Sequence, residues 1–418
     1  KRNEDTRRLF RIYSGLLEFP IVVLARNSQI RSDLWLRNGR GMFDMVLNYS
    51  EPHFCKALRD ADLALVQFAF IGLSSLGQRE LDASTTDKKV QVRAFSCANL
   101  VNLFLHRFGI FDFAGFLKAP HQYTDRYYSD IKEGYYPPEK QTDADLNSLP
   151  WTYSATNDPV RHKSMLEEFL YTMIILVTEL FAPPPVDAEG AARQAKLRLR
   201  REIVHRLASG PKAHSELAEV HHVLPMRDNM VLAEEGKLVN PDDATGAALE
   251  AALVEVADCK SFQGKSDKWE LQRWAWNEYD PAFFHLSLRQ HQNASEVRPN
   301  SLDSKDRSIT AMPYAPFPPP AHRSFTRLRR DITSDSAIIA VIYRALHVHC
   351  RDVVGEDDKF VNSVDNCVSE SYQTDAMSET ILGRVIHLLT LGTYAWESPL
   401  AEKSECWSDD GGGDVGSV

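Results

Sequence analysis

The clearest pattern of apolar and polar positions lies between residues 196 and 292, where it predicts a small domain of three helices and a hairpin. The first helix covers residues 197–207, because Leu199, Ile203 and Leu207 recur at every fourth position and therefore share one face. Glycine and proline follow this run closely and mark the end of the helix. The domain therefore opens with an amphipathic helix whose apolar side needs a core to pack against.

Two further helices and a pair of strands complete this domain. The second helix ends at Pro225, and the third is predicted from residue 247 to residue 258. The apolar positions of these two helices that we expect to face the core are Leu217, Val220, Leu224, Leu249, Leu253 and Val256. Residues 260–271 predict strand, glycine-containing turn and strand, since Trp269 and Leu271 alternate with polar neighbours. Three helices followed by a hairpin are typical of a winged helix.

The rest of the chain predicts helices, so we expect a mainly α fold, a helical scaffold with an embedded winged-helix (α+β) domain. Helical runs support this at residues 1–75, 90–111, 169–181, 325–350 and 380–396. The expected organisation is a helical scaffold at 1–195, the winged-helix domain at 196–292, a proline-rich linker at 293–323, a continuation of the helical scaffold at 324–400 and an acidic, glycine-rich tail at 401–418. The 418 residues, of which 43% are hydrophobic, suffice for a sizeable core.

The charge distribution argues against nucleic acid as a partner. A DNA-reading helix presents Arg, Lys, Asn or Gln to base edges, whereas the third helix offers Glu250, Glu255 and Asp258 and no basic residue. Residues 196–292 hold 13 Lys and Arg against 15 Asp and Glu, and the whole chain has a net charge of −10. The domain therefore lacks the excess of cations that binding to the phosphates of a nucleic-acid backbone requires. The basic run at 193–206 lacks an aromatic stacking platform, and we interpret it as a solvated helix face.

The sequence shows no motif for catalysis, cofactor binding or metal binding. The six cysteines are Cys55, Cys97, Cys259, Cys350, Cys367 and Cys406. None of them forms a Cys-x-x-Cys pair. His347 and His349 are two positions apart in a predicted helix and therefore point to different sides. Since phosphate-binding glycine loops and nucleophile elbows are also absent, we expect no catalytic residue, no cofactor-binding residue and no metal ligand in this chain.

A membrane is not an expected partner either. The apolar run at 169–181 is shorter than the roughly 20 residues that a membrane-spanning helix needs. Glu179 also interrupts it. Scattered cysteines are typical of reduced thiols, and the chain shows no secretory signal. We therefore expect a cytoplasmic protein, with the nucleus as a second compartment.

The first helix of the winged-helix region carries a resemblance to a known family. It resembles the winged helix of the UBR-box N-recognins, the large RING-type E3 ubiquitin ligases of the N-degron (N-end rule) pathway, at Leu-Arg-Arg-Glu-Ile-Val-His-Arg-Leu (199–207) and Gly-Pro-Lys-Ala-His-Ser-Glu-Leu (210–217). Shorter segments are similar to the family in the same order along the chain, at residues 32–39, 167–177, 279–285 and 378–389. The common order makes the set more specific than any single match. The loop at 228–241 is longer than expected of the family.

The resemblance implies the non-catalytic central part of such a ligase. In the family, a zinc-containing UBR box and a second small domain upstream read the amino-terminal degron, and a RING downstream recruits the ubiquitin-conjugating enzyme. This chain lacks the Cys/His density of such zinc modules, so zinc is expected only outside it. The implied role is to position the substrate-binding modules relative to the RING. The implied partners, reached through the full-length protein, are its other domains, the conjugating enzyme and N-degron substrates. Two alternatives stay open, a winged-helix nucleic-acid-binding protein and an interaction scaffold unrelated to ubiquitin.

Four aromatic residues just after the predicted hairpin are the candidate contact residues. They are Trp274, Trp276, Phe283 and Phe284. Aromatic side chains bury large areas. At this density we expect them to pack against a neighbouring domain or to contact a partner.

Overall fold

The computed structural model describes residues 2–32, 48–49, 51, 54–83, 97–110, 159–179, 181, 188–232, 241–260, 267–301, 323–354 and 378–397. Its helices are α1 (Arg2–Arg31), η1 (Cys55–Ala57), α3 (Arg59–Ala83), α4 (Cys97–Phe108), α7 (Pro159–Thr178), α8 (Ala188–Ala208), α9 (His214–Ala218), η4 (Glu219–His222), α10 (Met226–Leu232), α11 (Pro241–Val256), η5 (Arg273–Glu278), α12 (Leu288–Ser301), α13 (Arg323–Thr333), α14 (Ser336–Val354) and α15 (Glu379–Glu397). Its strands are β1 (Lys212–Ala213), β2 (Ala257–Lys260) and β3 (Lys268–Leu271). The fold is mainly α, as predicted.

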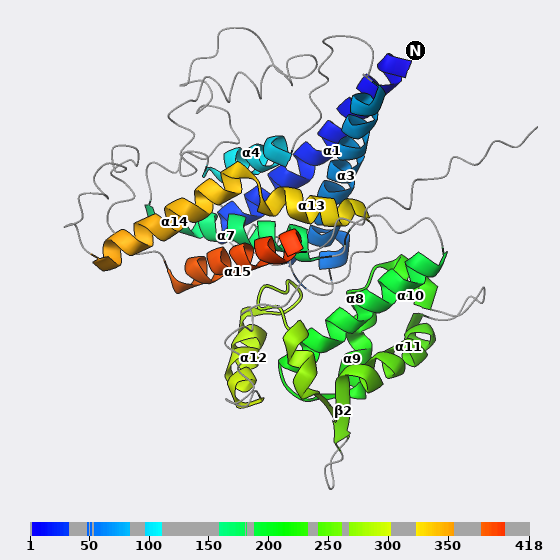
Figure 1. Cartoon of the computed structure of the whole chain (residues 1–418). Helices are drawn as coiled ribbons and strands as arrows, with labels where there is room; N and C mark the ends of the chain where they lie inside the picture. The colour runs from blue at the N-terminus through cyan, green and yellow to red at the C-terminus, as the bar shows by residue number, and fades with distance from the viewer. Residues whose placement is uncertain are drawn as a thin grey trace, which may run out of the picture.

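Helix α7 is the centre of the helical part of the molecule. Helices α1, α4, α13 and α15 pack against it, and α1 and α3 lie side by side (Figure 1). Because neighbours surround α7, its apolar residues are buried on every side, from Met165 through Phe169 to Val177. This explains why the sequence of α7 is a nearly continuous apolar run. Among the described residues, no helix combines the length and the apolar character that crossing a bilayer requires.

The winged helix consists of α8, α9, α10 and α11 with a three-stranded antiparallel sheet in the order β1-β3-β2. A hairpin is present, with Ala257 opposite Leu271 and Cys259 opposite Trp269. Its second strand lies within the predicted residues 260–271, whereas its first strand, β2, begins at Ala257, where a helix was predicted. Leu253 of α11 is fully buried, as the helical periodicity predicts. The first strand, β1, was not predicted, because a strand of two residues has no periodicity and exists only through its pairing with β3.

Three boundaries differ from the sequence-based expectation. Helix α11 begins at Pro241 and ends at Val256, instead of the predicted 247–258, and β2 begins at the next residue, Ala257. Helix α10 occupies part of the stretch expected as a loop, and the buried carboxylate of Asp228 anchors it by accepting two hydrogen bonds from Arg198 at 3.0 and 2.8 Å. The predicted helix at 325–350 is two helices, because Asp335 caps α14.

The expected linker at 293–323 is helical in its first part, since α12 runs through Ser301. A capping box starts α12: the Ser287 amide donates to Gln290 Oε1 at 2.8 Å, and the Gln290 amide donates to Ser287 Oγ at 3.3 Å. Ala294 is fully buried and fixes the helix to the core. The proline-rich residues of the linker and the predicted tail at 401–418 lie outside the described residues.

Candidate functional site

The four candidate aromatic residues fall into two groups. Trp276, Phe283 and Phe284 are buried, whereas 48% of Trp274 is exposed. The Trp274 indole donates to Gln272 Oε1 at 2.6 Å, and the Arg200 guanidinium lies 5.4 Å from the centroid of the Trp274 ring system. Trp274 is therefore the candidate that remains open to solvent on the winged helix.

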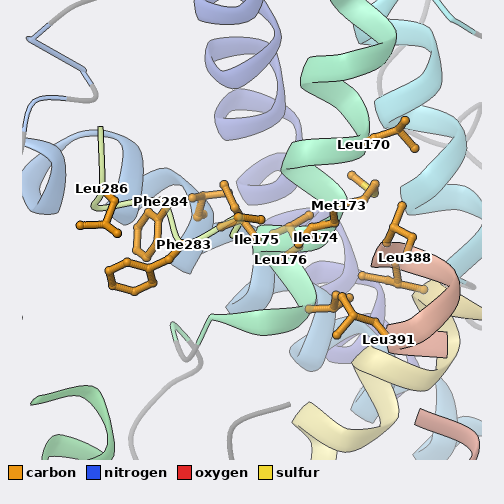
Figure 2. Close-up of a cluster of buried hydrophobic side chains, with 14 of the residues drawn as sticks. Leu170, Met173, Ile174, Ile175, Leu176, Phe283, Phe284, Leu286, Leu388 and Leu391 are labelled. Atoms are coloured by element: carbon orange, nitrogen blue, oxygen red, sulfur yellow. The ribbon is translucent and has the colours of Figure 1, made fainter. Parts of the chain in front are cut away.

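Phe284 lies where the winged helix meets the helical part. Its ring contacts Phe181 edge-on with centroids 5.3 Å apart, and the guanidinium of Arg59 lies 4.5 Å from its ring centroid. Arg59 Nη1 also donates to the Phe284 carbonyl at 3.1 Å. Figure 2 shows Phe283, Phe284 and Leu286 beside Ile175 of α7, within one cluster of buried apolar side chains. Residues 279–286, which we call the post-wing segment, thus join the hydrophobic core of the helices.

Buried charges accompany this apolar contact. We call the polar set the junction, and it consists of Arg59, Asp60, Glu179, Arg201, Glu202, His205, Asp280, His285 and His387. It joins α8 and the post-wing segment to α3, to Glu179 directly after α7, and to α15. Burying a polar group costs free energy unless the group is hydrogen-bonded or ion-paired. Each charged side chain of the junction therefore needs a partner inside the protein.

Arg201 holds one half of the junction together. Its Nη2 donates to Glu179 Oε1 at 2.7 Å and to Asp280 Oδ2 at 2.9 Å, and 10% of its side chain is exposed. Burial alone would lower the pKa of Arg201, but the two carboxylates outweigh burial and raise it. Burial favours a neutral Asp280, yet His387 and Arg201 hold its pKa at about 2. The interpretation of the basic run as a solvated helix face is therefore wrong for Arg201.

His205 completes this half as a neutral side chain. Its Nε2 accepts a hydrogen bond from the Asp280 amide at 2.9 Å, so its Nδ1 carries the proton and donates to the Arg201 carbonyl at 2.7 Å. Burial and the charge of Arg201 hold the pKa of His205 well below its usual value. The ring stacks on Phe283 with centroids 3.9 Å apart. His205 thereby fixes the post-wing segment against α8.

His285 is the centre of the other half. Its Nε2 donates to Asp60 Oδ2 at 2.9 Å, and its Nδ1 donates to Glu202 Oε1. Burial alone would lower the pKa of His285, but Glu202 and Asp60 outweigh it and hold that pKa well above its usual value. Arg59 Nε contacts the other oxygen of Asp60 at 3.1 Å. The ligand atoms of Cys55, Asp60 and His285 lie within 4.8 Å of one another, so these three residues offer the donor set for a metal ion.

Sequence reasoning missed the junction because its members are far apart in the chain. Asp60 and His285 are separated by 225 positions, although their side chains share a hydrogen bond. One signal was present: Asp280 and His285 flank aromatic residues in the post-wing segment, and polar residues at such positions need buried partners. The pairing itself depends on how the helices pack.

A groove of about 860 Å³ lies on the winged helix between α8 and α11. Its lining includes four alanines, namely Ala192, Ala248, Ala251 and Ala252. It shares Arg201 and His205 with the junction, and its lining contains no serine, threonine or cysteine. We therefore take the junction, and not this groove, as the candidate site.

Comparisons with known proteins agree with this architecture. Residues 198–312 match a family model described as "E3 ubiquitin-protein ligase UBR1-like, winged-helix domain". The chain is 23% identical over 306 residues to the human E3 ubiquitin-protein ligase UBR2 and 22% identical over 307 residues to the mouse protein. Each alignment covers 73% of this chain and 13% of the relative, so the chain spans a small part of the length of these relatives. The chain is therefore similar to the UBR-type E3 ubiquitin ligases, and residues 198–312 match the model of their winged-helix domain.

Proposed function

We propose that this chain is the non-catalytic middle part of an N-degron-recognising E3 ubiquitin ligase. In that role it holds the substrate-binding modules at a fixed position relative to the RING and the ubiquitin-conjugating enzyme. The similarity to UBR2, which extends over 73% of the chain but 13% of the relative, supports the ligase context. The partners in this proposal are the other domains of the ligase, its conjugating enzyme and its N-degron substrates. The proposed compartment is the cytoplasm, with the nucleus as a second one.

The observation that carries the proposal is the buried connection between the winged helix and the helices. A flexible hinge between two domains would leave its polar groups in water. Here the ion pairs Arg201–Glu179 and His285–Asp60 cross between the two parts with side chains that are at most 10% exposed. Removing one partner of a buried pair costs about 3–5 kcal/mol. The two parts therefore favour a single relative orientation, which is what a positioning element requires.

Positioning has a direct kinetic consequence for a RING ligase. Such a ligase forms no covalent intermediate and acts by orienting the charged conjugating enzyme toward the substrate. A displacement of about 1 Å far from the chemistry reduces a rate by about a hundredfold in well-oriented systems. A rigid connection in the middle of the ligase therefore contributes to ubiquitin transfer without touching the reacting atoms.

The nucleic-acid alternative finds no support on the surface of α11. This helix contains no Lys or Arg, and Glu250 and Glu255 are exposed on it. Glu255 pairs with Arg200, which therefore neutralises a carboxylate of the domain itself. A phosphate-binding surface needs unpaired cations, and we propose neither nucleic acid nor membrane as a partner.

The test uses the full-length ligase with the double substitution Phe283→Ser and Phe284→Ser. We expect substrate ubiquitylation to slow by about tenfold or more, because the post-wing segment loses its core contacts, while degron-peptide affinity stays at the wild-type value. The control is Val254→Ser, which removes an exposed apolar side chain from α11 of the same domain and should leave both readouts unchanged.

Two results would contradict the proposal. The first is ubiquitin transfer by this chain alone in the presence of the activating and conjugating enzymes. The second is a double variant that stays folded by circular dichroism but no longer binds the degron peptide.

A further inference from the structure

Cys55 lies beside two residues of the junction, Asp60 and His285, and the three side chains offer different metal-binding atoms. Cys55 comes from η1, Asp60 from the first turn of α3 and His285 from the post-wing segment. Their sulfur, oxygen and nitrogen ligand atoms all lie within 4.8 Å of one another. Cys55 is fully buried, and 8% of Asp60 is exposed. The three donors are therefore shielded from solvent and held on segments with defined backbone structure.

Two of the three metal-binding side chains, Asp60 and His285, are each oriented by a neighbouring charged residue. Arg59 contacts Asp60 Oδ1 through Nε and Nη2, at 3.1 and 3.0 Å, and so leaves Oδ2 facing His285 Nε2 at 2.9 Å. On the other side of the ring, Glu202 accepts the hydrogen bond from His285 Nδ1. A carboxylate behind the histidine that binds a metal is a common arrangement in zinc sites, because it fixes the ring and raises its basicity.

The sequence alone led us to expect no metal ligand in this chain; from the structure we infer that Cys55, Asp60 and His285 form a zinc-binding site between the winged helix and the helical part of the chain. Zinc accepts thiolate, imidazole and carboxylate ligands together, whereas calcium and magnesium take oxygen ligands. Three protein ligands leave a fourth position on the ion. The inference rests on this donor set and is independent of the proposed ligase role.

The charge of the junction is compatible with a divalent cation. Without metal, the cations Arg59 and protonated His285 balance the carboxylates of Asp60 and Glu202. When zinc binds, the thiol proton of Cys55 and the Nε2 proton of His285 leave to solvent, and the metal takes their place. Two positive charges enter with zinc and two protons leave, so the net charge of the buried cluster does not change. A buried cluster tolerates such an exchange better than an added charge.

A zinc ion here would connect two distant parts of the chain. Cys55 and Asp60 belong to the helical part, whereas His285 belongs to the post-wing segment. Since the folded chain presents all three ligands and the unfolded chain does not, zinc would stabilise the junction by binding the native state. We therefore expect the metal to raise the temperature at which the chain unfolds.

The experiment uses the full chain, reduced and stripped with a chelator, then loaded with Zn²⁺ and dialysed. We expect about one zinc ion per chain by elemental analysis, as for a three-ligand site. The variant Cys55→Ser should lose it, while the control Cys259→Ser, which changes an exposed cysteine on β2, should retain it. Loading with Co²⁺ in place of zinc should give the near-ultraviolet absorption of a cobalt–thiolate bond in the wild type and in the control but not in Cys55→Ser.

Zinc uptake by wild type that is lost in Cys55→Ser but kept in the control supports the site, as does a zinc-dependent rise in melting temperature with the same pattern. Absence of retained zinc from the wild-type chain overturns it, as does equal retention by Cys55→Ser. If Cys55→Ser does not fold, the wild-type stoichiometry and the cobalt–thiolate absorption of the control decide the question. In that case, cobalt binding without thiolate absorption also overturns the inference.

Discussion

Replacing Arg201 with Met tests the junction most directly. The guanidinium of Arg201 donates to Glu179 and Asp280, whose side chains are 6% and 4% exposed. Met fills a similar volume but leaves both carboxylates buried without their guanidinium partner. Since breaking a buried pair by removing one partner costs about 3–5 kcal/mol, we expect Arg201→Met to lower the free energy of unfolding by about that amount.

The neighbouring residue in α8 supplies the control. Arg200 also pairs with two carboxylates, but the side chains of Glu278 and Glu255 are 39% and 62% exposed. Exposed ion pairs contribute about 0–1 kcal/mol, because water and salt screen them. Arg200→Met should therefore cost about 1 kcal/mol or less, although it removes the same chemical group one position away.

A rescue experiment separates the buried charge from the lost packing. In the triple variant Arg201→Met, Glu179→Gln and Asp280→Asn, neither carboxylate stays buried without its guanidinium partner, so the loss should be smaller than in Arg201→Met alone. Urea denaturation followed by tryptophan fluorescence gives each free energy from midpoint and slope. Equal losses in the two arginine variants, or a triple variant less stable than Arg201→Met, would refute the reasoning.

Three other predictions use different parts of the structure. Leu253→Ala should cost about 2–5 kcal/mol in urea denaturation, because its side chain is fully buried; the control Val254→Ala, on the exposed side of α11, should cost less than about 1 kcal/mol, and equal costs would show that the helix phase is wrong. The lowered pKa of Asp280, about 2 against the usual 3.8, contributes about 2 kcal/mol of stability above pH 4 that is lost as pH falls toward 2; Asp280→Asn should flatten this part of the pH–stability curve, and an unchanged slope would contradict the assignment. The chain should not bind duplex DNA specifically, because the surface of α11 is acidic. A salt-sensitive, sequence-dependent mobility shift at micromolar protein would contradict this prediction.

The winged helix was largely predictable because its signals are local. Leu249, Leu253 and Val256 mark the buried face of α11 through helical spacing, and the structure buries all three. Strand β3 follows from the alternation around Trp269 and Leu271, whereas β2 begins three residues earlier than predicted. Periodicity reports which side of an element is apolar, and it needs no knowledge of the partner element.

Short elements were less predictable because their partners define them. Strand β1 exists through two paired residues, Lys212 and Ala213, opposite β3. Helix α10 depends on the ion pair between Asp228 and Arg198, which are 30 positions apart. Neither stretch is long enough to show a period of its own, so the sequence alone gives no signal for them.

The basic run of α8 shows most clearly where the sequence stops being informative. Arg200 and Arg201 are adjacent and chemically identical, yet Arg201 is buried between Glu179 and Asp280 while Arg200 remains partly exposed. Propensity and periodicity place both on the same helix. Only the tertiary structure, which places α8 beside Glu179 and the post-wing segment, decides which arginine is buried.

The sequence by itself determined the helical class, the winged helix and the acidic character of α11, because these depend on residue type and short-range spacing. The tertiary structure decided the junction and the proposed zinc ligands. Cys55 and Asp60 meet His285 across more than 200 intervening residues, because α3, α8 and the post-wing segment converge on one buried point. Burial then sets the chemistry of these side chains, because a charge removed from water is stable only beside the partner that the fold supplies.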